Sequence, residues 1–306
     1  MDQSSTSTQG LLDLTHPASG QLLRLAPAAG FAGVSWQVGG REHLHLSQPL
    51  DQFLREEHTG GLPLLYPWAN RLRSDQWSFG GKRIDLDGHA RVHRDGNGRP
   101  MHGLLVRWSD WETQATDGGC MAAIDWQDHE VLMAAFPFAH RLEIQWTLDS
   151  DGLEVRTSVT AGDERVPVSF GWHPYVVIPG ASRGDITMHL PDVEEVPLDE
   201  DCLPVPGADR TPAGGARPLG ERSWDHCFSG ISDGDTVELR ATAGGIQFEF
   251  LEGWRWMQIY SPDGADFACI EPMTAITAAL DDQDPPGPVV DPGCTYTARF
   301  RMRSCS

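Results

Sequence analysis

The chain has 306 residues, of which 44 are acidic and 23 are basic, so its formal net charge is -21. A surface this negative disfavours nucleic acid and anionic membranes as partners, because both require positive potential on the protein. A neutral or weakly polar small molecule is the more natural ligand, and a chain of this length can bury a large core.

The first ten residues, MDQSSTSTQG, are polar and lack the basic and apolar regions of a signal peptide. We expect a flexible tail at about residues 1–10. No apolar run approaches the roughly 18 residues that a membrane span needs. The six cysteines are scattered without a CxxC pair, which is typical of reduced thiols rather than of a zinc site or a disulfide scaffold. These features predict a cytoplasmic protein.

Alternation of apolar and polar residues predicts β-strands along the chain. It is present in HLHL after Glu42 and in WSFGGKRIDL, and it is clearest in RLEIQWTL (141–148). The following DSDG turn and LEVRTSVT complete a β-hairpin, and TVELRATAGGIQFEF (236–250) forms a second one. TYTARFRM (295–302) is the last predicted strand. Helical periodicity is nearly absent and 33 glycines and 22 prolines interrupt the chain, so an all-β protein of many short antiparallel strands is expected.

Two segments lack a strand pattern. Residues 197–223 and 281–293 are rich in proline, glycine and aspartate and are expected to be loops. Strand-like sequence of the same kind continues on both sides of each, so we interpret residues 1–306 as a single domain with long surface loops.

Polar residues that interrupt apolar strands are the candidates for chemistry, because burying them is costly unless they are paired or used. Asn70 and Arg71 follow an aromatic run in YPWANRLRS, where the alternative is a turn with a solvated arginine. His102 precedes Gly103 in RPMHGLLVRW, and the glycine permits close backbone approach. A structural histidine is the alternative there.

The segment FGWHPYVVI places His173 and Pro174 inside a run that otherwise resembles a buried strand. Proline has no backbone donor, so it marks an edge, a bulge or a strand end. We therefore expect His173 to lie where the ladder stops, a position from which a side chain can face a cleft. The alternative is a core histidine with both ring nitrogens hydrogen-bonded.

Two carboxylates have similar settings. Asp225 follows a tryptophan in SWDHCF, where a capping role is the alternative. Glu271 follows the apolar run of FACIEPMTA, and Pro272 is expected to end that strand directly after it. Burial should raise the pKa of the Glu271 carboxyl, which suits a general base near neutral pH, whereas a salt bridge to an arginine is the alternative.

Other chemistries have less support. Two histidines, a glutamate and an aspartate could bind a metal, but they lie far apart and form no His-x-His or HExxH pair. The chain also has no P-loop, no dinucleotide-binding GxGxxG between strand and helix, and no GxSxG elbow.

In this order, YPWANRLRS, MHGLLVRW, GWHPY, SWDHCF and CIEPMTA resemble the motifs of the aldose 1-epimerase family, the galactose mutarotases. The resemblance extends from the strands near Leu22 to the last predicted strand. It implies a large antiparallel β-sandwich, a supersandwich, with a sugar held in an open cleft on one sheet. It also implies an isomerase that interconverts the α and β anomers of an aldohexose.

The resemblance implies a role for each candidate. Glu271 matches the general base that takes the proton from the anomeric hydroxyl, and His173 matches the general acid that protonates the ring oxygen. His102 is similar to a second histidine near that oxygen. Asn70, Arg71 and Asp225 fall on positions that bind sugar hydroxyls. The family's reaction needs no metal and no organic cofactor, and we expect a monomer or a homodimer with a small-molecule sugar substrate.

Three further points bear on the substrate. GWHPYVVI departs from the sequence of the best-known mutarotases and is closer to divergent bacterial members and to hexose-6-phosphate 1-epimerases. The substrate phosphate of such an enzyme could meet the basic segment between Arg71 and Arg99, for which a solvated basic loop is the favoured alternative. A non-catalytic sugar-binding module is a further alternative, disfavoured by the presence of both Glu271 and His173. Four aromatic residues beside the candidates could stack on a sugar or pack in the core: Trp68, Trp172, Tyr175 and Trp224.

Overall fold

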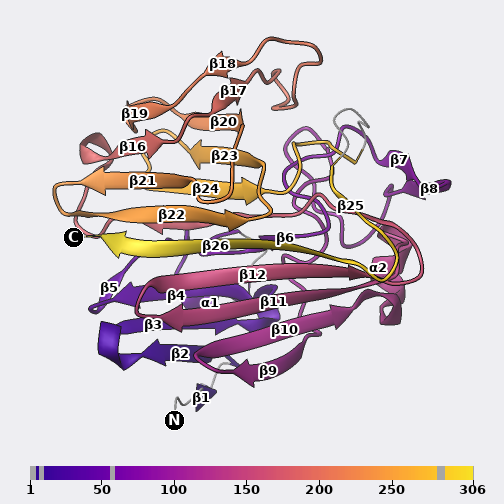
Figure 1. The fold of residues 1–306 in the computed structure, drawn as a ribbon, viewed down its shortest axis with the longest axis horizontal. Helices are drawn as coiled ribbons and strands as arrows, with labels where there is room; N and C mark the ends of the chain where they lie inside the picture. The colour runs from indigo at the N-terminus through magenta and orange to yellow at the C-terminus, as the bar shows by residue number, and fades with distance from the viewer. Residues whose placement is uncertain (1–4, 7–9, 56–58, 281–286, 306) are drawn as a thin grey trace.

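The structure is a computed structural model, and it describes residues 5–6, 10–55, 59–280 and 287–305. It is dominated by antiparallel β-sheet, as the alternating pattern predicts, and it confirms the expected all-β sandwich (Figure 1). Most of the expected N-terminal tail and part of the expected loop at 281–293 lie outside the described residues.

The longest sheet has nine strands. It contains both predicted hairpins and the last predicted strand, with the apolar residues of each on one buried face. The order across it is β19 (Gly215–Pro218), β16 (Thr187–Leu190), β21 (Thr236–Ala241), β22 (Gly244–Glu252), β26 (Thr295–Cys305), β12 (Gly152–Ala161), β11 (His140–Asp149), β10 (Gly119–Asp125) and β9 (Glu112–Thr116).

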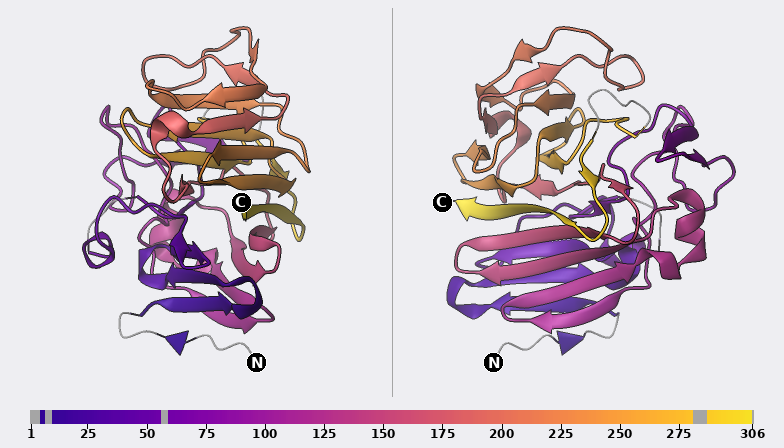
Figure 2. Two further views of the ribbon diagram at one scale, coloured as in Figure 1. Left: turned by 90° about the vertical axis from the view of Figure 1, so that its left-hand side faces the viewer. Right: turned by 45° about the vertical axis from the view of Figure 1, so that its right-hand side comes forward.

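Two further sheets lie behind this one in Figure 1, and Figure 2 shows the layers from the side. The five-stranded sheet has the order β1 (Ser5–Thr6), β2 (Leu12–His16), β3 (Gln21–Ala26), β4 (Ala32–Val38) and β5 (Arg41–Glu42). The eight-stranded sheet has the order β18 (Thr211–Pro212), β17 (Glu194–Val196), β20 (Trp224–Ser229), β23 (Trp256–Ser261), β24 (Phe267–Met273), β14 (Gly171–Trp172) and β6 (Leu64–Leu65), with β15 (Tyr175–Val177) also paired to β24.

The remaining elements are short. Two strand pairs stand apart from the large sheets: the hairpin of β7 (Gln76–Phe79) with β8 (Lys82–Asp85), and the long-range pair of β13 (Val166–Pro167) with β25 (Val289–Val290). The helical turns are α1 (Leu50–Phe53), α2 (Glu130–Ala135), η1 (Pro17–Ser19), η2 (Pro27–Ala29), η3 (Trp126–Asp128) and η4 (Arg183–Asp185). No helix in the described part of the chain is long and apolar enough to cross a membrane.

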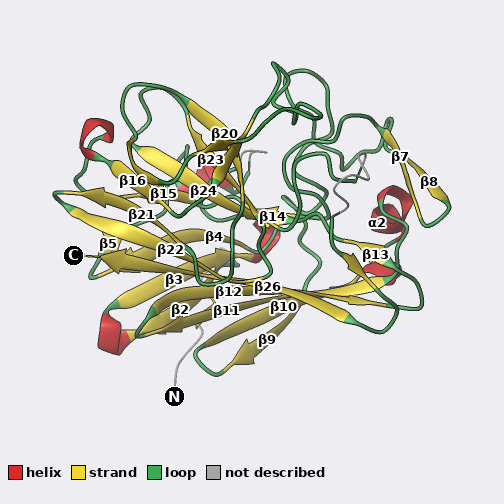
Figure 3. Ribbon diagram, turned by 45° about the horizontal axis from the view of Figure 1, so that its top comes forward, coloured by secondary structure: helices red, strands yellow, loops and turns green. Residues whose placement is uncertain are grey.

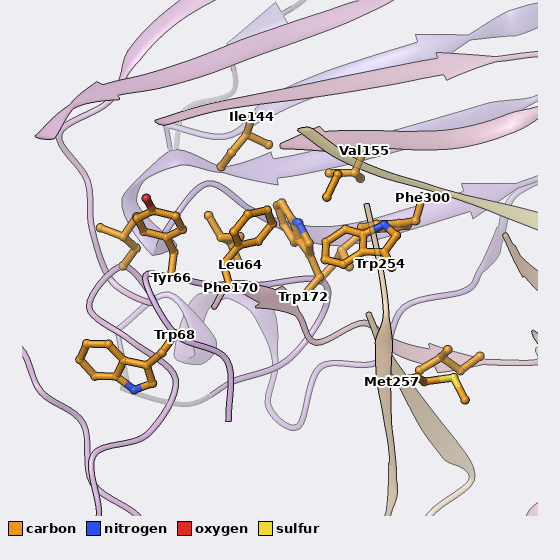
Figure 4. Close-up of a cluster of buried hydrophobic side chains, with 14 of the residues drawn as sticks. Leu64, Tyr66, Trp68, Ile144, Val155, Phe170, Trp172, Trp254, Met257 and Phe300 are labelled. Atoms are coloured by element: carbon orange, nitrogen blue, oxygen red, sulfur yellow. The ribbon is translucent and has the colours of Figure 1, made fainter. Parts of the chain in front are cut away.

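The large hydrophobic core joins the eight-stranded and nine-stranded sheets. Figure 4 shows its centre, where Trp172 lies beside Phe300 and Phe170 lies near Tyr66. The Trp172 ring contacts Trp146 edge-on with the centroids 5.2 Å apart, and its Nε1 donates a hydrogen bond to the Thr157 hydroxyl at 3.0 Å. This packing fixes the strand that leads into His173.

Three expectations need correction. Residues 43–46 form a single bridge at Leu44 rather than a strand. The loop expected at 197–223 contains β18 and β19, which are exposed edge strands and therefore lack an alternating pattern. Strand β24 does not end at Pro272 but continues to Met273.

Candidate active site

A break between two short strands places His173. β14 and β15 both pair with β24, at Met273 and at residues 267–269, and His173 with Pro174 fills the gap between them. The backbone N–H of His173 donates instead to the carbonyl oxygen of Pro63 at 3.0 Å. The expectation that the ladder stops at His173 is therefore confirmed.

The same gap explains why β24 tolerates Pro272. Among the described strands none pairs with residues 270–272 on this side, whereas on the other side β23 pairs with β24 through that region. A residue without an N–H can continue a strand where one of its ladders is interrupted. The interruption also leaves the buried Glu271 beside the gap rather than under a neighbouring strand.

Glu271 and His173 are in direct contact. His173 Nε2 lies 3.3 Å from Glu271 Oε1, and the two residues are 5% and 2% exposed. Burial raises the pKa of the Glu271 carboxyl well above its ordinary range and lowers the pKa of His173 to about 3. Both shifts disfavour charge, so the single proton of the pair resides on Glu271 and leaves His173 neutral.

Two tyrosines fix the plane of the His173 imidazole. Tyr175 stacks on it with the centroids 4.4 Å apart and the rings 8° from parallel, while Tyr260 meets it edge-on at 6.0 Å. The Tyr175 hydroxyl is itself hydrogen-bonded to the hydroxyl of Thr59 at 2.7 Å. The imidazole is thus held in one orientation, with Nε2 toward Glu271.

Asn70 and His102 both have a strained backbone conformation, and a backbone hydrogen bond connects them. Both adopt a left-handed conformation, with φ of 54° and 61°, and the His102 N–H donates to the Asn70 carbonyl oxygen at 2.9 Å. Non-glycine residues in this region cost energy and are often found at functional sites. Gly103 permits the arrangement, because a Cβ there would lie 2.1 Å from the carbonyl oxygen of Tyr66.

The side chains of this segment face the acid–base pair. The His102 ring meets His173 edge-on with the centroids 5.5 Å apart. Burial lowers the pKa of His102 well below its ordinary value, and His173 and Arg71 lower it further. His102 is therefore neutral at physiological pH and can act as a hydrogen-bond donor or acceptor.

Arg71 is oriented by two neighbours. Its Nη1 donates to Asn70 Oδ1 at 2.7 Å, and its Nε donates to Asp95 Oδ2 at 2.9 Å. Asp95 was not identified from the sequence, because nothing in RDGNGRP separates it from an ordinary turn aspartate.

Asp225 is the second residue of β20 and is held through both carboxylate oxygens. Gln258 Nε2 donates to Oδ1 at 2.5 Å, and the Cys202 thiol lies 3.4 Å from Oδ2. Gln258 is 1% exposed and lies directly opposite Glu271 in the β23–β24 pair. The sequence analysis missed Gln258, although a glutamine between Met257 and Ile259 in a buried strand was a usable signal.

The structure brings all six candidates together. The negative charge of Asp225 adds to burial in raising the pKa of Glu271, and the positive charge of Arg71 opposes them. The charges of His173 and Arg71 likewise act on His102, whose pKa both of them lower. The segments that follow β6 and β14, the loop that contains His102, and strands β20 and β24 therefore supply one site, and Figure 3 shows loops gathered beside β14.

Three of the four aromatic candidates belong to the core instead. Trp68, Trp172 and Trp224 are at most 1% exposed, so none of them offers a ring face to a sugar. Trp68 and Trp172 pack among other core residues, and the Trp224 ring is covered by the Arg222 guanidinium, 3.8 Å from its centroid.

A cavity of about 450 Å³ adjoins the site at His102. Its lining includes three arginines, Arg91, Arg94 and Arg107, and no carboxylate among its described residues. Arg94 is paired with Asp75 at 2.7 Å. In the described part of the chain, no three His, Cys, Asp or Glu residues are grouped so as to hold a metal ion.

Fold and site together define an all-β sandwich with a buried carboxylate–imidazole pair at a strand break. Residues 32–303 match the sequence profile of the family described as aldose 1-epimerase. The chain therefore belongs to the aldose 1-epimerase family. A search of curated proteins gave no match.

Solved structures share the fold over their whole length. The Slr1438 protein of Synechocystis sp. PCC 6803 is similar with a TM-score of 0.79 at 23% identity, covering 100% of this chain and 99% of that one. A galactose mutarotase-like protein of Clostridium acetobutylicum has a TM-score of 0.82 at 16% identity, covering 99% and 97%. The GalM/aldose epimerase homologue of C. elegans has a TM-score of 0.77 at 16% identity, covering 97% and 99%.

Proposed function

We propose that the protein is an aldose 1-epimerase that interconverts the α and β anomers of an aldohexose. The observation that carries this proposal is the 3.3 Å contact between the buried side chains of His173 and Glu271. Anomer exchange needs one group that takes a proton and another that gives one, both working near neutral pH. A protein that only binds sugars needs no such matched pair.

Ring opening proceeds from the less populated form of the singly protonated pair, in which Glu271 is ionised and His173 carries the proton. Glu271 takes the proton from the anomeric hydroxyl while His173 donates a proton to the ring oxygen, so the C1–ring-oxygen bond breaks and C1 becomes an aldehyde. The two proton transfers leave Glu271 protonated and His173 neutral, the state that burial of both groups favours.

Ring closure reverses these roles. After rotation about C1–C2, neutral His173 removes the proton from the sugar hydroxyl that attacks C1, and Glu271 returns its proton to the new anomeric oxygen. The pair then has its starting protonation, so no proton needs to enter from solvent. The contact of the neutral His102 ring with His173 supports a role for His102 in hydrogen-bonding the ring oxygen through this exchange.

Hydroxyl recognition is assigned to the polar groups around the pair: Asn70, Arg71, Asp225 and Gln258. Among the described residues, His102 Nδ1 and Gln258 Oε1 are buried and have no hydrogen-bond partner. Buried polar atoms without partners are costly, and sugar hydroxyls would satisfy them.

A second candidate is a hexose-6-phosphate 1-epimerase. The arginines in the cavity beside His102 favour it, because a phosphate on a bound sugar would meet positive charge there. Affinity for glucose 6-phosphate that exceeds affinity for glucose and falls steeply with salt would support this substrate.

The deciding experiment follows fresh α-D-glucose and α-D-galactose by polarimetry, with the spontaneous rate subtracted. We expect acceleration by the protein and its loss, by orders of magnitude in kcat, in Glu271→Gln. Glu130→Gln, an exposed residue of α2, is the matched control. If neither sugar nor glucose 6-phosphate is turned over, a sugar-binding module becomes the leading interpretation.

A further inference from the structure

A tight turn at residues 199–204 lies against the proposed sugar site. Asp199 builds it: its Oδ1 accepts hydrogen bonds from the N–H groups of Asp201 at 3.0 Å and Leu203 at 2.9 Å. The N–H of Cys202 donates to the Asp199 carbonyl oxygen at 3.0 Å. Cys202 is thereby held in a left-handed conformation with φ of 57°, and the buried Leu203 anchors the turn.

One side of this turn contacts Asp225. The Cys202 Sγ lies 3.4 Å from Asp225 Oδ2, while Gln258 holds Oδ1. Burial and the neighbouring Asp225 raise the pKa of the Cys202 thiol, so at neutral pH the thiol is protonated and donates the hydrogen bond. Both oxygens of Asp225 therefore have a fixed donor, and their remaining lone pairs point in set directions.

The other side of the turn contacts the segment that orients Arg71. Asp201 accepts hydrogen bonds from Asn97 Nδ2 at 2.8 Å and from Arg99 Nη2 at 2.5 Å. The N–H groups of Asn97 and Arg99 both donate to Asp95 Oδ1 at 2.9 Å. Asp95 Oδ2 in turn accepts from Arg71 Nε.

These contacts form one chain from Asp225 through Cys202, Asp201 and Asp95 to Arg71. We infer that the turn at 199–204 is a strap that sets the spacing of Asp225 and Arg71, with Cys202 as the positioning residue for sugar binding. The inference rests on the proposed function. Neither Glu271 nor His173 is hydrogen-bonded to the strap, so its loss should weaken binding of the sugar rather than the proton transfers.

The test compares Cys202→Ala with Cys202→Ser. Both replacements have a Cβ and so carry the same left-handed backbone strain as cysteine, but only serine keeps a donor for Asp225. We expect Cys202→Ala to raise KM and the sugar Kd by about three- to tenfold with kcat within about twofold, and Cys202→Ser to restore most of the binding. Circular dichroism confirms that both variants are folded.

A second variant acts from the far side of the strap. Asp201→Ala removes the contacts with Asn97 and Arg99 and should raise KM in the same direction, with Asp117→Ala in the exposed β9–β10 turn as the control. The double variant Asp201→Ala/Cys202→Ala should raise KM by less than the product of the two single-variant factors, because both substitutions disrupt the same turn.

The outcomes separate the two proposals. Unchanged KM in Cys202→Ala, or a serine variant as weak as alanine, overturns the strap while leaving the epimerase intact. A loss of kcat at unchanged KM overturns it as well. If the wild type binds the sugars without turnover, the same comparison is made on Kd by calorimetry. A wild type that neither binds nor converts sugar overturns both.

Discussion

His173 Nε2 and Glu271 Oε1 are 3.3 Å apart, and they come from two antiparallel neighbours: His173 directly follows β14, and Glu271 lies in β24. The contact exists because the pairing of β24 with β14 and β15 is interrupted between these two short strands, and His173 lies in that interruption. Burial then shifts the two pKa values in opposite directions, the carboxyl upward and the imidazole downward. The proposed reaction requires the pair to hold one proton, so these shifts fix its pH range.

The first prediction is a broad pH profile of kcat/KM. A second proton binds only when His173, with a pKa of about 3, becomes charged beside protonated Glu271, so activity should persist on acidification through about pH 5. Activity should fall on the alkaline side, where the pair loses its proton at a pKa raised above that of an ordinary glutamate. Polarimetry with the spontaneous rate subtracted at each pH measures both limbs. A fall centred near pH 6.5 on acidification would contradict the shared-proton pair.

The second prediction uses the two charges that act on Glu271. Asp225 raises the pKa of Glu271, so Asp225→Asn should move the alkaline limb to lower pH. Arg71 lowers that pKa, so Arg71→Gln should move the limb to higher pH. Both variants should also raise KM, because both side chains are assigned to hydroxyl recognition. Shifts in the same direction, or none in either variant, would show that another group controls the alkaline limb.

The third prediction concerns the backbone under His102. Gly103→Ala would place a Cβ 2.1 Å from the Tyr66 carbonyl oxygen at a φ of +70°. Gly98→Ala is the matched control, since its φ is +82° but no atom lies within 4 Å of the new Cβ. We expect a loss of about 1 kcal/mol in the free energy of unfolding for Gly98→Ala and of at least about 3 kcal/mol for Gly103→Ala. Urea denaturation measures both, and equal losses would mean that the close approach to Tyr66 is not needed.

Sequence alone predicts the large sheets well, because their strands have one buried and one exposed face. From Leu142 to Leu148 in β11 the apolar side chains alternate without interruption, in β12 Thr157 interrupts the series, and both strands appear where the pattern places them. Strand β24 is different: it is buried along nearly its whole length, so its pattern has no period and Pro272 alone cannot mark its end.

The candidate site divides in the same way. Residues that break a pattern, such as His173 and Glu271, can be found in the sequence. Gln258 also breaks an apolar pattern, but its role and that of Cys202 come from strand register and from contacts with Asp225. Such contacts depend on which strands become neighbours, which local sequence does not determine.

The last prediction concerns a buried histidine outside the site. His140 lies in the core, with Nδ1 2.6 Å from the Phe138 carbonyl oxygen and Nε2 2.5 Å from the Tyr66 hydroxyl. A carbonyl oxygen can only accept, so Nδ1 carries the proton and Nε2 accepts from Tyr66. Burial lowers the pKa of His140 to about 4, and the folded state therefore holds this imidazole neutral.

Acidification should therefore weaken the fold through His140. Between the unfolded pKa of 6.5 and the folded pKa of about 4, the unfolded chain binds a proton that the folded chain does not, so stability is complete above this window and is lost as pH falls through it. The loss is about 3 kcal/mol for this residue. Urea denaturation at several pH values should show a shallower loss for His140→Gln than for the wild type, whatever its stability at neutral pH. His189→Gln, at an exposed position on β16, is the control. Equal pH slopes for His140→Gln and the wild type would mean that His140 becomes protonated within the folded core.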